Sequence, residues 1–219
     1  MSMHLIKRAP VECDVFHLLF HGRRNKASDR YPLSVMTTSL IALFVGTSLL
    51  ASDLTPGGDN VLELYVEKTG LLAGKRHRFV FDRFEGQLDE SHVTMTIDAA
   101  SIRCVDTWVS ANDLKKIEKT ARTEMLDVSR FPSLKFESTA TRQTAPDRFE
   151  VSGTLTVRDK SRTVVVVVMK TGNRSYRGSA KIRLTDFGLK PPSTALGLVG
   201  TKDEMTFAFV LVERNNEAS

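Results

Sequence analysis

Apolar and polar residues alternate along most of the chain after residue 60. Eight segments carry this alternation: residues 62–66, 78–84, 93–97, 134–138, 148–157, 163–169, 176–184 and 205–212. Successive side chains of a strand point to opposite faces, so a period of two predicts half-buried antiparallel strands. Gly86 is expected to end the second segment. With mostly short connections, the pattern predicts an all-β protein, either an up-and-down barrel of about eight strands or a sandwich.

One face of each predicted strand is aliphatic or aromatic, and we assign this face to the interior. The residues on it, which are also the candidate ligand-binding residues, are Phe79, Phe81, Val93, Met95, Ile97, Leu134, Phe136, Leu155, Val157, Val165, Val167, Ile182, Leu184, Phe207 and Phe209. A barrel of eight strands has an interior that side chains can fill or that can hold one slim ligand. The pattern therefore leaves two alternatives open, a dry tunnel with room for a ligand and a fully packed small barrel.

One segment follows a helical period instead. Its apolar residues recur at intervals of three and four and form one stripe, made of Leu114, Ile117, Ala121 and Met125. This stripe predicts one main α-helix over about residues 112–126, and the spacing of Ser110 and Asp113 is that of a capping box at its start. Lysines and an arginine cover the opposite side. The favoured interpretation is a helix docked on the sheet with a solvated back; the alternative is a helix that contacts an anionic membrane.

The first 52 residues differ from the rest of the chain. An apolar run, residues 40–50, follows four basic residues between Arg23 and Arg30, which is the charge order of a secretory signal. The run is too short to span a bilayer comfortably. We therefore expect residues 1–52 to be a leader that is cleaved from an exported, periplasmic or secreted protein. The alternatives are a first element of the fold, or a translation start at Met36 that leaves the protein in the cytoplasm.

Charge and composition narrow the function classes for the body, which we place at residues 60–213 before a polar tail at 214–219. The net charge is +5, but six Lys and Arg against three acids precede Asp53, and the remainder holds 25 against 23. Because much of the basicity belongs to the leader, no nucleic-acid binding is expected. The two cysteines, Cys13 and Cys104, lie one in the leader and one in the body, which excludes a framework of disulfides.

Candidate catalytic and metal-binding residues are few. Asp186, with the Phe and Gly that follow it, spells the metal-binding triplet of protein kinases, but the other kinase motifs are not evident. His77 and His92 have no carboxylate nearby at ligand spacing, so they form a poor metal site. Nothing in the sequence pairs an acid with a base or a nucleophile. We therefore expect no catalysis, no metal and no cofactor.

The motifs of the body together resemble the YceI-like family of polyisoprenoid-binding, lipocalin-like proteins. The matching features are Gly74 with His77, residues 93–98 leading into Ser101-Ile102, Asn112-Asp113-Leu114, Met125-Leu126-Asp127, Phe131-Pro132, residues 136–139, residues 153–157 with Arg162-Thr163-Val164, Asp186-Phe187-Gly188 and residues 203–207. The resemblance covers residues 60–213. The chain departs from the family in its long, proline-rich loop at residues 190–197 and in having one histidine where some relatives have two.

The resemblance implies a closed antiparallel barrel with a helix at its rim and a long apolar tunnel that binds an isoprenoid chain. The expected partner is thus an isoprenoid or other long-chain lipid, with transient membrane contact as a further expectation. One polar group near the tunnel mouth, from among His77, Asp106 and Asp186, is expected to contribute specificity. The alternatives are a stress-protective or structural interaction protein without a ligand and, less favoured, a small hydrolase-type enzyme at the barrel mouth.

Overall fold

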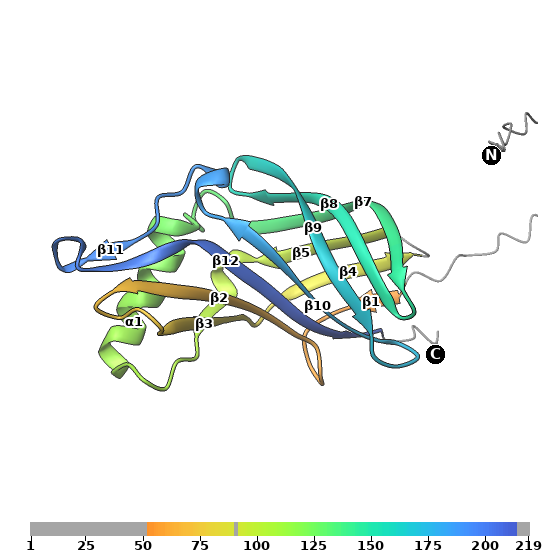
Figure 1. Ribbon diagram of the computed structural model, residues 1–219, viewed down its shortest axis with the longest axis horizontal. Coiled ribbons are helices and arrows are strands. Elements are labelled where there is room, and N and C mark those ends of the chain that lie inside the picture. The colour runs from red at the N-terminus through yellow and green to blue at the C-terminus, as the bar shows by residue number, and fades with distance from the viewer. Residues whose placement is uncertain (1–51, 90–91, 214–219) are drawn as a thin grey trace, which may run out of the picture. The chain divides into compact units, whose positions relative to one another are not determined.

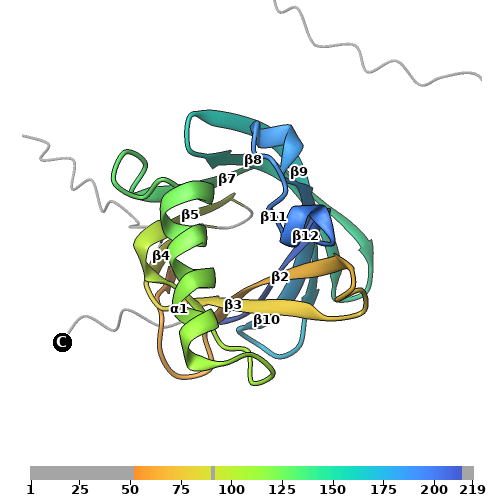
Figure 2. The same ribbon diagram turned by 90° about the vertical axis from the view of Figure 1, so that its left-hand side faces the viewer.

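The computed structural model describes residues 52–89 and 92–213, and these form one curled antiparallel sheet with a helix at one end (Figure 1; Figure 2). The strands are β1 (Ser52–Leu54), β2 (Val61–Gly70), β3 (Arg76–Phe81), β4 (Phe84–Asp89), β5 (His92–Asp98), β6 (Ile102–Cys104), β7 (Ser133–Ala145), β8 (Arg148–Val157), β9 (Lys160–Lys170), β10 (Ser175–Arg183), β11 (Ser193–Thr194) and β12 (Val199–Val212). The helix α1 spans Ala111–Thr120 and continues as a π-helical turn, Ala121–Met125. Short 3-10 turns cover Ala99–Ser101, Thr185–Phe187 and Ala195–Gly197. The all-β fold with one main helix, predicted from the sequence, is confirmed.

The chain itself closes the curled sheet. The hydrogen-bonded path runs β1-β4-β5-β7-β8-β9-β10-β12-β2-β3-β6, so β3 and β4 lie near its two ends although they are consecutive in the sequence. A kink at Asp82 and Arg83 carries β3 into β4, and the 3-10 turn before β6 carries β5 into β6. Two backbone hydrogen bonds join these kinks: Asp98 N donates to Arg83 O at 3.0 Å, and Asp82 N donates to Ser101 O at 3.3 Å. The result is a barrel-like sheet.

Twelve strands are present in the described residues, not about eight. The two kinks divide two long strands into β3 with β4 and β5 with β6, and the short strands β1 and β11 add two more. Gly86 does not end a strand, as the sequence suggested, but lies inside β4 opposite Met95. A Cβ at Gly86 would come within 2.8 Å of Thr94 O, so glycine permits this close approach of β4 to β5. β1 also precedes Asn60, where the sequence placed the start of the barrel.

The predicted helix is present with the predicted cap. Ser110 Oγ accepts a hydrogen bond from Asp113 N at 3.2 Å, which satisfies one of the free N–H groups at the helix start. Leu114, Ile117 and Met125 pack against the buried residues of the barrel. The apolar stripe of the helix is therefore used for docking on the sheet, the favoured interpretation of its pattern.

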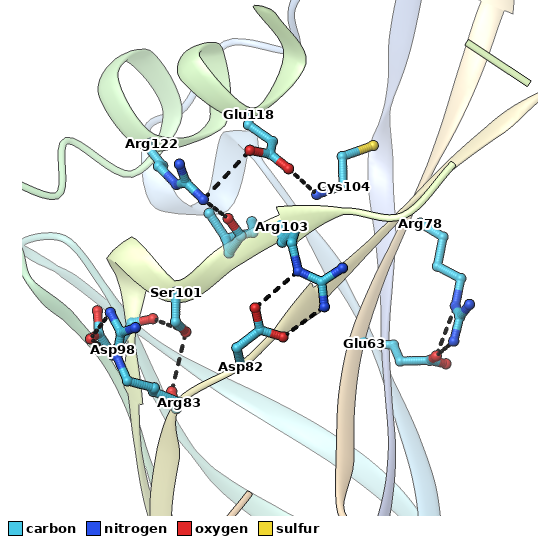
Figure 3. A network of polar contacts seen from close by, with 11 residues as sticks. Glu63, Arg78, Asp82, Arg83, Asp98, Ser101, Arg103, Cys104, Glu118 and Arg122 are labelled. Atoms are coloured by element: carbon cyan, nitrogen blue, oxygen red, sulfur yellow. Dashed lines mark hydrogen bonds and ion pairs between the residues drawn. The ribbon is translucent and has the colours of Figure 1, made fainter. Parts of the chain in front are cut away.

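Polar contacts fix α1 to β6 (Figure 3). Glu118 Oε1 accepts a hydrogen bond from Cys104 N at 3.0 Å, and Arg122 Nη2 donates to Ile102 O at 2.7 Å. The same guanidinium lies 3.6 Å from Glu118. These contacts satisfy backbone groups of β6, which is an edge of the sheet, so the helix covers one end of the barrel and protects an exposed strand.

The leader and the polar tail, residues 1–51 and 214–219, lie outside the described residues, so the prediction of export remains a prediction. Ser52 alone of the proposed leader is described, as the first residue of β1. Among residues 52–89 and 92–213, no helix combines the length and apolarity needed to cross a bilayer.

Candidate functional site

The interior of the barrel has two different halves. Near α1, large side chains from several strands are buried in contact with one another. This filled half contains Val66, Phe79, Phe81, Ile102, Cys104, Leu134, Val157, Leu184, Phe187, Leu189 and Met205. The hollow half lies toward the other end, where the β7–β8 and β9–β10 turns and the end of β12 meet (Figure 1).

The hollow half contains a cavity of about 340 Å³. Of its 21 lining residues, 18 are apolar, contributed by strands around the whole barrel. The three polar ones are Thr141, Lys170 and Tyr176. A cavity of this size and apolarity lies in the range of small-molecule sites, which are mostly apolar with a few placed polar groups. It is the candidate functional site.

Small residues on the inward face make room for this cavity. Gly153 and Gly178 lie on β8 and β10, and each has an aromatic ring from a neighbouring strand against it. A Cβ at Gly153 would meet the Phe136 ring at 2.4 Å, and one at Gly178 would meet the Phe209 ring at 2.5 Å. Because the glycines have no side chain, these rings can lie against the wall of the barrel and leave the centre open. Ala180, opposite Phe207, adds a third small position.

A β-bulge in β7 changes which residues of that strand face the cavity. The pairing register between β7 and β8 shifts between Ser138 and Ala140. Before the shift, Phe136 faces inward; after it, Thr141 does. One extra residue in a strand exchanges its two faces beyond that point, so the bulge brings a hydroxyl group to the cavity lining.

Lys170 and Tyr176 are directly paired across β9 and β10 near the β9–β10 turn, at the end of the barrel away from α1. Lys170 follows Val164, Val166 and Val168 on the same face of β9, so its stem continues the apolar wall. Burial, together with the neighbouring Glu213 carboxylate, raises the pKa of the Tyr176 hydroxyl to about 12, so it stays a neutral hydrogen-bonding group at physiological pH. Sequence reasoning missed both residues, although the two-residue period from Val164 to Lys170 was available as a signal.

The structure brings together eight of the fifteen candidate ligand-binding residues at the cavity. These are Val93, Met95, Ile97, Phe136, Leu155, Ile182, Phe207 and Phe209. Five others belong to the filled half and do not line the cavity: Phe79, Phe81, Leu134, Val157 and Leu184. Their inward orientation agrees with the alternation, but depth along the barrel separates them from the site. Contact of the eight with a ligand stays a prediction.

The assignment of the valine run to faces needs correction. Val165 and Val167 are 49% and 44% exposed and lie on the outer face, whereas Val164, Val166 and Val168 line the cavity. In five consecutive valines, alternation cannot distinguish the two faces. The register with β8 decides it, because Val166 pairs with Val151, whose side chain is buried inside. The two-residue turn at Arg158 and Asp159 fixes that register and was the signal in the sequence.

The three residues proposed for the tunnel mouth lie elsewhere. His77 is buried at the α1 end, where Nδ1 lies 2.5 Å from Asp106 Oδ2 and the ring stacks on Trp108 with centroids 5.2 Å apart. Asp106 also accepts a hydrogen bond from Arg78 N at 2.8 Å. Asp186 is exposed in a 3-10 turn. None of the three lines the cavity, because they lie toward the α1 end, whereas the lining extends to residues such as Thr141, Lys170 and Tyr176 at the other end.

His77, Cys104 and Asp106 form a group that has the composition of a metal site. One ligand atom from each lies within 4.8 Å of the other two. Burial, the largest cause, raises the pKa of the Cys104 thiol to about 12, so without a metal ion the thiol stays protonated at physiological pH. His77 Nδ1 lies 2.5 Å from Asp106 Oδ2 in this group, and both side chains are buried. His92 is exposed on β5, with Nε2 3.7 Å from Glu137 Oε1.

Comparison with known proteins identifies the family. The sequence matches the family model of the YceI-like domain over residues 64–212, which is more than half of the chain. The chain belongs to the YceI-like family. Curated relatives of the YceI-like protein include a UPF0312 protein of Pseudomonas savastanoi, 24% identical over 182 residues that cover 72% of this chain and 90% of the relative. A UPF0312 protein of Azotobacter vinelandii is 22% identical over 180 residues, 71% of this chain and 89% of the relative.

Solved structures share the YceI-like fold. BcnA of Burkholderia cenocepacia superposes with a TM-score of 0.54 at 22% identity, over 69% of this chain and 95% of BcnA. A polyisoprenoid-binding domain from Saccharophagus degradans, implicated in plant cell wall breakdown, superposes with a TM-score of 0.52 at 11% identity. It covers 75% of this chain and 99% of that domain. At these identities the likeness establishes the fold.

Proposed function

We propose that this YceI-like protein binds the apolar chain of an isoprenoid or similar long-chain lipid in the cavity of its hollow half. The observation that carries the proposal is the lining, 18 apolar residues around about 340 Å³ with three polar residues. The polyisoprenoid-binding domain of similar fold supports the choice of ligand class. The proposed physiological role is transport or storage of the lipid, with transient contact between protein and membrane when lipid is loaded.

The size of the cavity agrees with a partly enclosed chain. A dry apolar cavity of about 150 Å³ takes up one benzene molecule. By that standard, 340 Å³ holds roughly twelve carbon atoms, and the rest of a longer chain would extend beyond the cavity. Burial contributes about 0.8 kcal/mol per methylene, or roughly 10 kcal/mol before the cost of association. After an association cost of about 4 kcal/mol or more, about 6 kcal/mol at most remains, which corresponds to a dissociation constant in the range of tens of micromolar.

The composition of the cavity lining favours ligand binding over catalysis. Thr141, Lys170 and Tyr176 are its polar residues, and no carboxylate or imidazole of the described residues belongs to it. General acid–base catalysis needs a group of suitable pKa within reach of the substrate. The buried pair His77 and Asp106 is in the filled half. That the protein is not an enzyme remains a prediction, which assays on lipid esters would test.

The test is native mass spectrometry of the protein purified from its own host, with extraction and identification of the bound lipid. Met95→Trp and Phe136→Trp place a large ring at the cavity lining and should abolish the lipid adduct. Lys181→Trp, on the outer face of β10, is the matched control and should keep it. Wild-type protein without any lipid, and without uptake of added isoprenoid, would contradict the proposal and favour a structural or stress-protective role.

A further inference from the structure

Lys170 is the one basic residue that lines the cavity among the described residues. It ends β9, directly opposite Tyr176, and its backbone N–H donates to Asp147 O at 2.8 Å. Its side chain is half-buried and continues the inward face of the valine run. The fold therefore holds the stem of a cationic side chain against an apolar wall, at the end of the cavity that is away from α1.

The ammonium group of Lys170 has no ion-pair or hydrogen-bond partner among the residues that the structure describes. Glu213 and Asp147 are the acidic residues that contact Tyr176 and Lys170 here, and neither carboxylate forms an ion pair with Lys170 within the described residues. Glu213 lies 3.7 Å from Arg174 Nε and also interacts with the Tyr176 hydroxyl. The Glu213 carboxylate thus already has a cationic partner, Arg174, and a hydrogen-bond donor, Tyr176. On the outer side of β7 and β8, Glu150 is likewise paired, with Arg142.

A half-buried ammonium group without a protein partner is stabilised when a bound anion pairs with it. At the end of the cavity away from α1, the head group of a lipid whose tail fills the apolar lining would lie beside Lys170, Tyr176 and Thr141. Lysine is a strong donor to phosphate and carboxylate groups, and the neutral Tyr176 hydroxyl can add a hydrogen bond.

We propose that the cavity selects a long-chain lipid with an anionic head group, a phosphate or a carboxylate, which is bound by the Lys170 ammonium group. This inference rests on the proposed function, because the tail must occupy the cavity for the head to reach Lys170. The competing account is that the lysine extends its charged end into water and contributes only its stem. The two differ in whether the charge of the ligand matters.

The experiment compares four ligands in displacement of a fluorescent apolar probe from the full chain. Farnesyl phosphate and farnesol differ in the phosphate alone, and palmitate and hexadecanol differ in the carboxylate. Each ligand is titrated against wild type, Lys170→Met and Lys160→Met. Lys160 is at the opposite end of the same strand, exposed and 3.3 Å from Asp159, so its replacement changes net charge equally without touching the cavity. Circular dichroism and the midpoint of unfolding confirm that each variant is folded.

Wild type and Lys160→Met should bind at least one anionic ligand roughly tenfold or more tightly than its neutral partner, as for a charge-assisted hydrogen bond. Lys170→Met should lose this preference and keep its affinity for the neutral alcohol. Which anionic ligand shows the preference decides between phosphate and carboxylate. Equal affinity for charged and neutral ligands in wild type, or a preference that survives in Lys170→Met, overturns the head-group proposal and leaves tail binding intact. Failure of all four ligands to bind overturns both.

Discussion

The two halves of this barrel interior are built from the same alternating strands and yet differ in what they hold. In the half near α1, Phe79, Phe81 and Leu134 fill the space between the sheet walls. In the other half, Gly153 and Gly178 have no side chain on the inner wall. The Phe136 ring lies against Gly153 and the Phe209 ring against Gly178. An apolar strand face therefore predicts that the residues on it lie inside the barrel. The sizes of the side chains that face one another decide whether that interior is filled or contains a cavity.

The filled half also has a closing element, a helix, that the described part of the chain does not provide for the hollow half. The helix α1 covers one end of the sheet, and Glu118 and Arg122 tie it to the backbone of β6. At the other end, the described residues form turns between strands (Figure 1). We interpret the filled half as the part that stabilises the fold, which allows the hollow half to keep unfilled space at a cost in stability.

The largest expected effect comes from making the same truncation in each half. Phe79→Ala should lower the free energy of unfolding by about 3–5 kcal/mol, because it opens a new void in a packed region. Phe149→Ala, at the cavity lining, should cost only about 1–2 kcal/mol, because its ring already borders empty space. Urea denaturation measures both. Equal losses would show that the two halves do not differ in packing.

The second prediction tests the corrected faces of β9. Val166→Trp should reduce uptake of an isoprenoid more than tenfold, because the ring occupies the cavity. Val167→Trp, one residue away on the outer face, should leave uptake unchanged. Fluorescent probe displacement gives both affinities. The reverse outcome would mean that the strand presents its other face to the ligand.

The third prediction uses the pKa of the Cys104 thiol to test whether water is excluded from the filled half. Burial raises the pKa of its thiol from 9.0 to about 12 in the folded protein. The folded state therefore holds this proton more tightly than the unfolded state, so the stabilisation is complete below pH 9 and is lost as the pH rises from 9 to 12. At pH 10 the loss should be about 1 kcal/mol relative to pH 8.

Cys104→Ala should lack this part of the alkaline dependence. Urea denaturation of wild type and variant at pH 8 and pH 10 isolates it, since tyrosines and lysines titrate equally in both proteins. An identical change for the two proteins would show that the thiol is not desolvated in the folded state.

The smallest effect is expected at the helix that covers the filled half. Ser110→Ala removes the side-chain cap of α1 and should lower stability by about 1 kcal/mol or less. Ser110→Asp keeps an acceptor at this position and should restore most of the loss. Lipid uptake should not change, because the helix is at the other end from the cavity. A large drop in uptake for Ser110→Ala would mean that the two halves are coupled.

The sequence by itself determined the class of fold, the family and the one helix. Alternation with a period of two is a local property, so it located most strands, and the stripe from Leu114 to Met125 with the cap at Ser110 located α1. The same alternation separated inward from outward residues wherever the two faces differ in polarity. It placed Phe136, Phe207 and Phe209 correctly on the inner face.

Only the tertiary structure decided which inward residues surround empty space and which polar groups lie beside it. Depth along a barrel depends on register and curvature, which no single strand encodes, and so the sequence did not indicate that His77 and Asp106 lie away from the cavity. The face of the valine run depends on the hairpin register with β8, and the face of Thr141 on a bulge in β7. Because each is a pairing between segments, the alternation within one strand does not determine it, although the two-residue turn between β8 and β9 was a signal for the valine run.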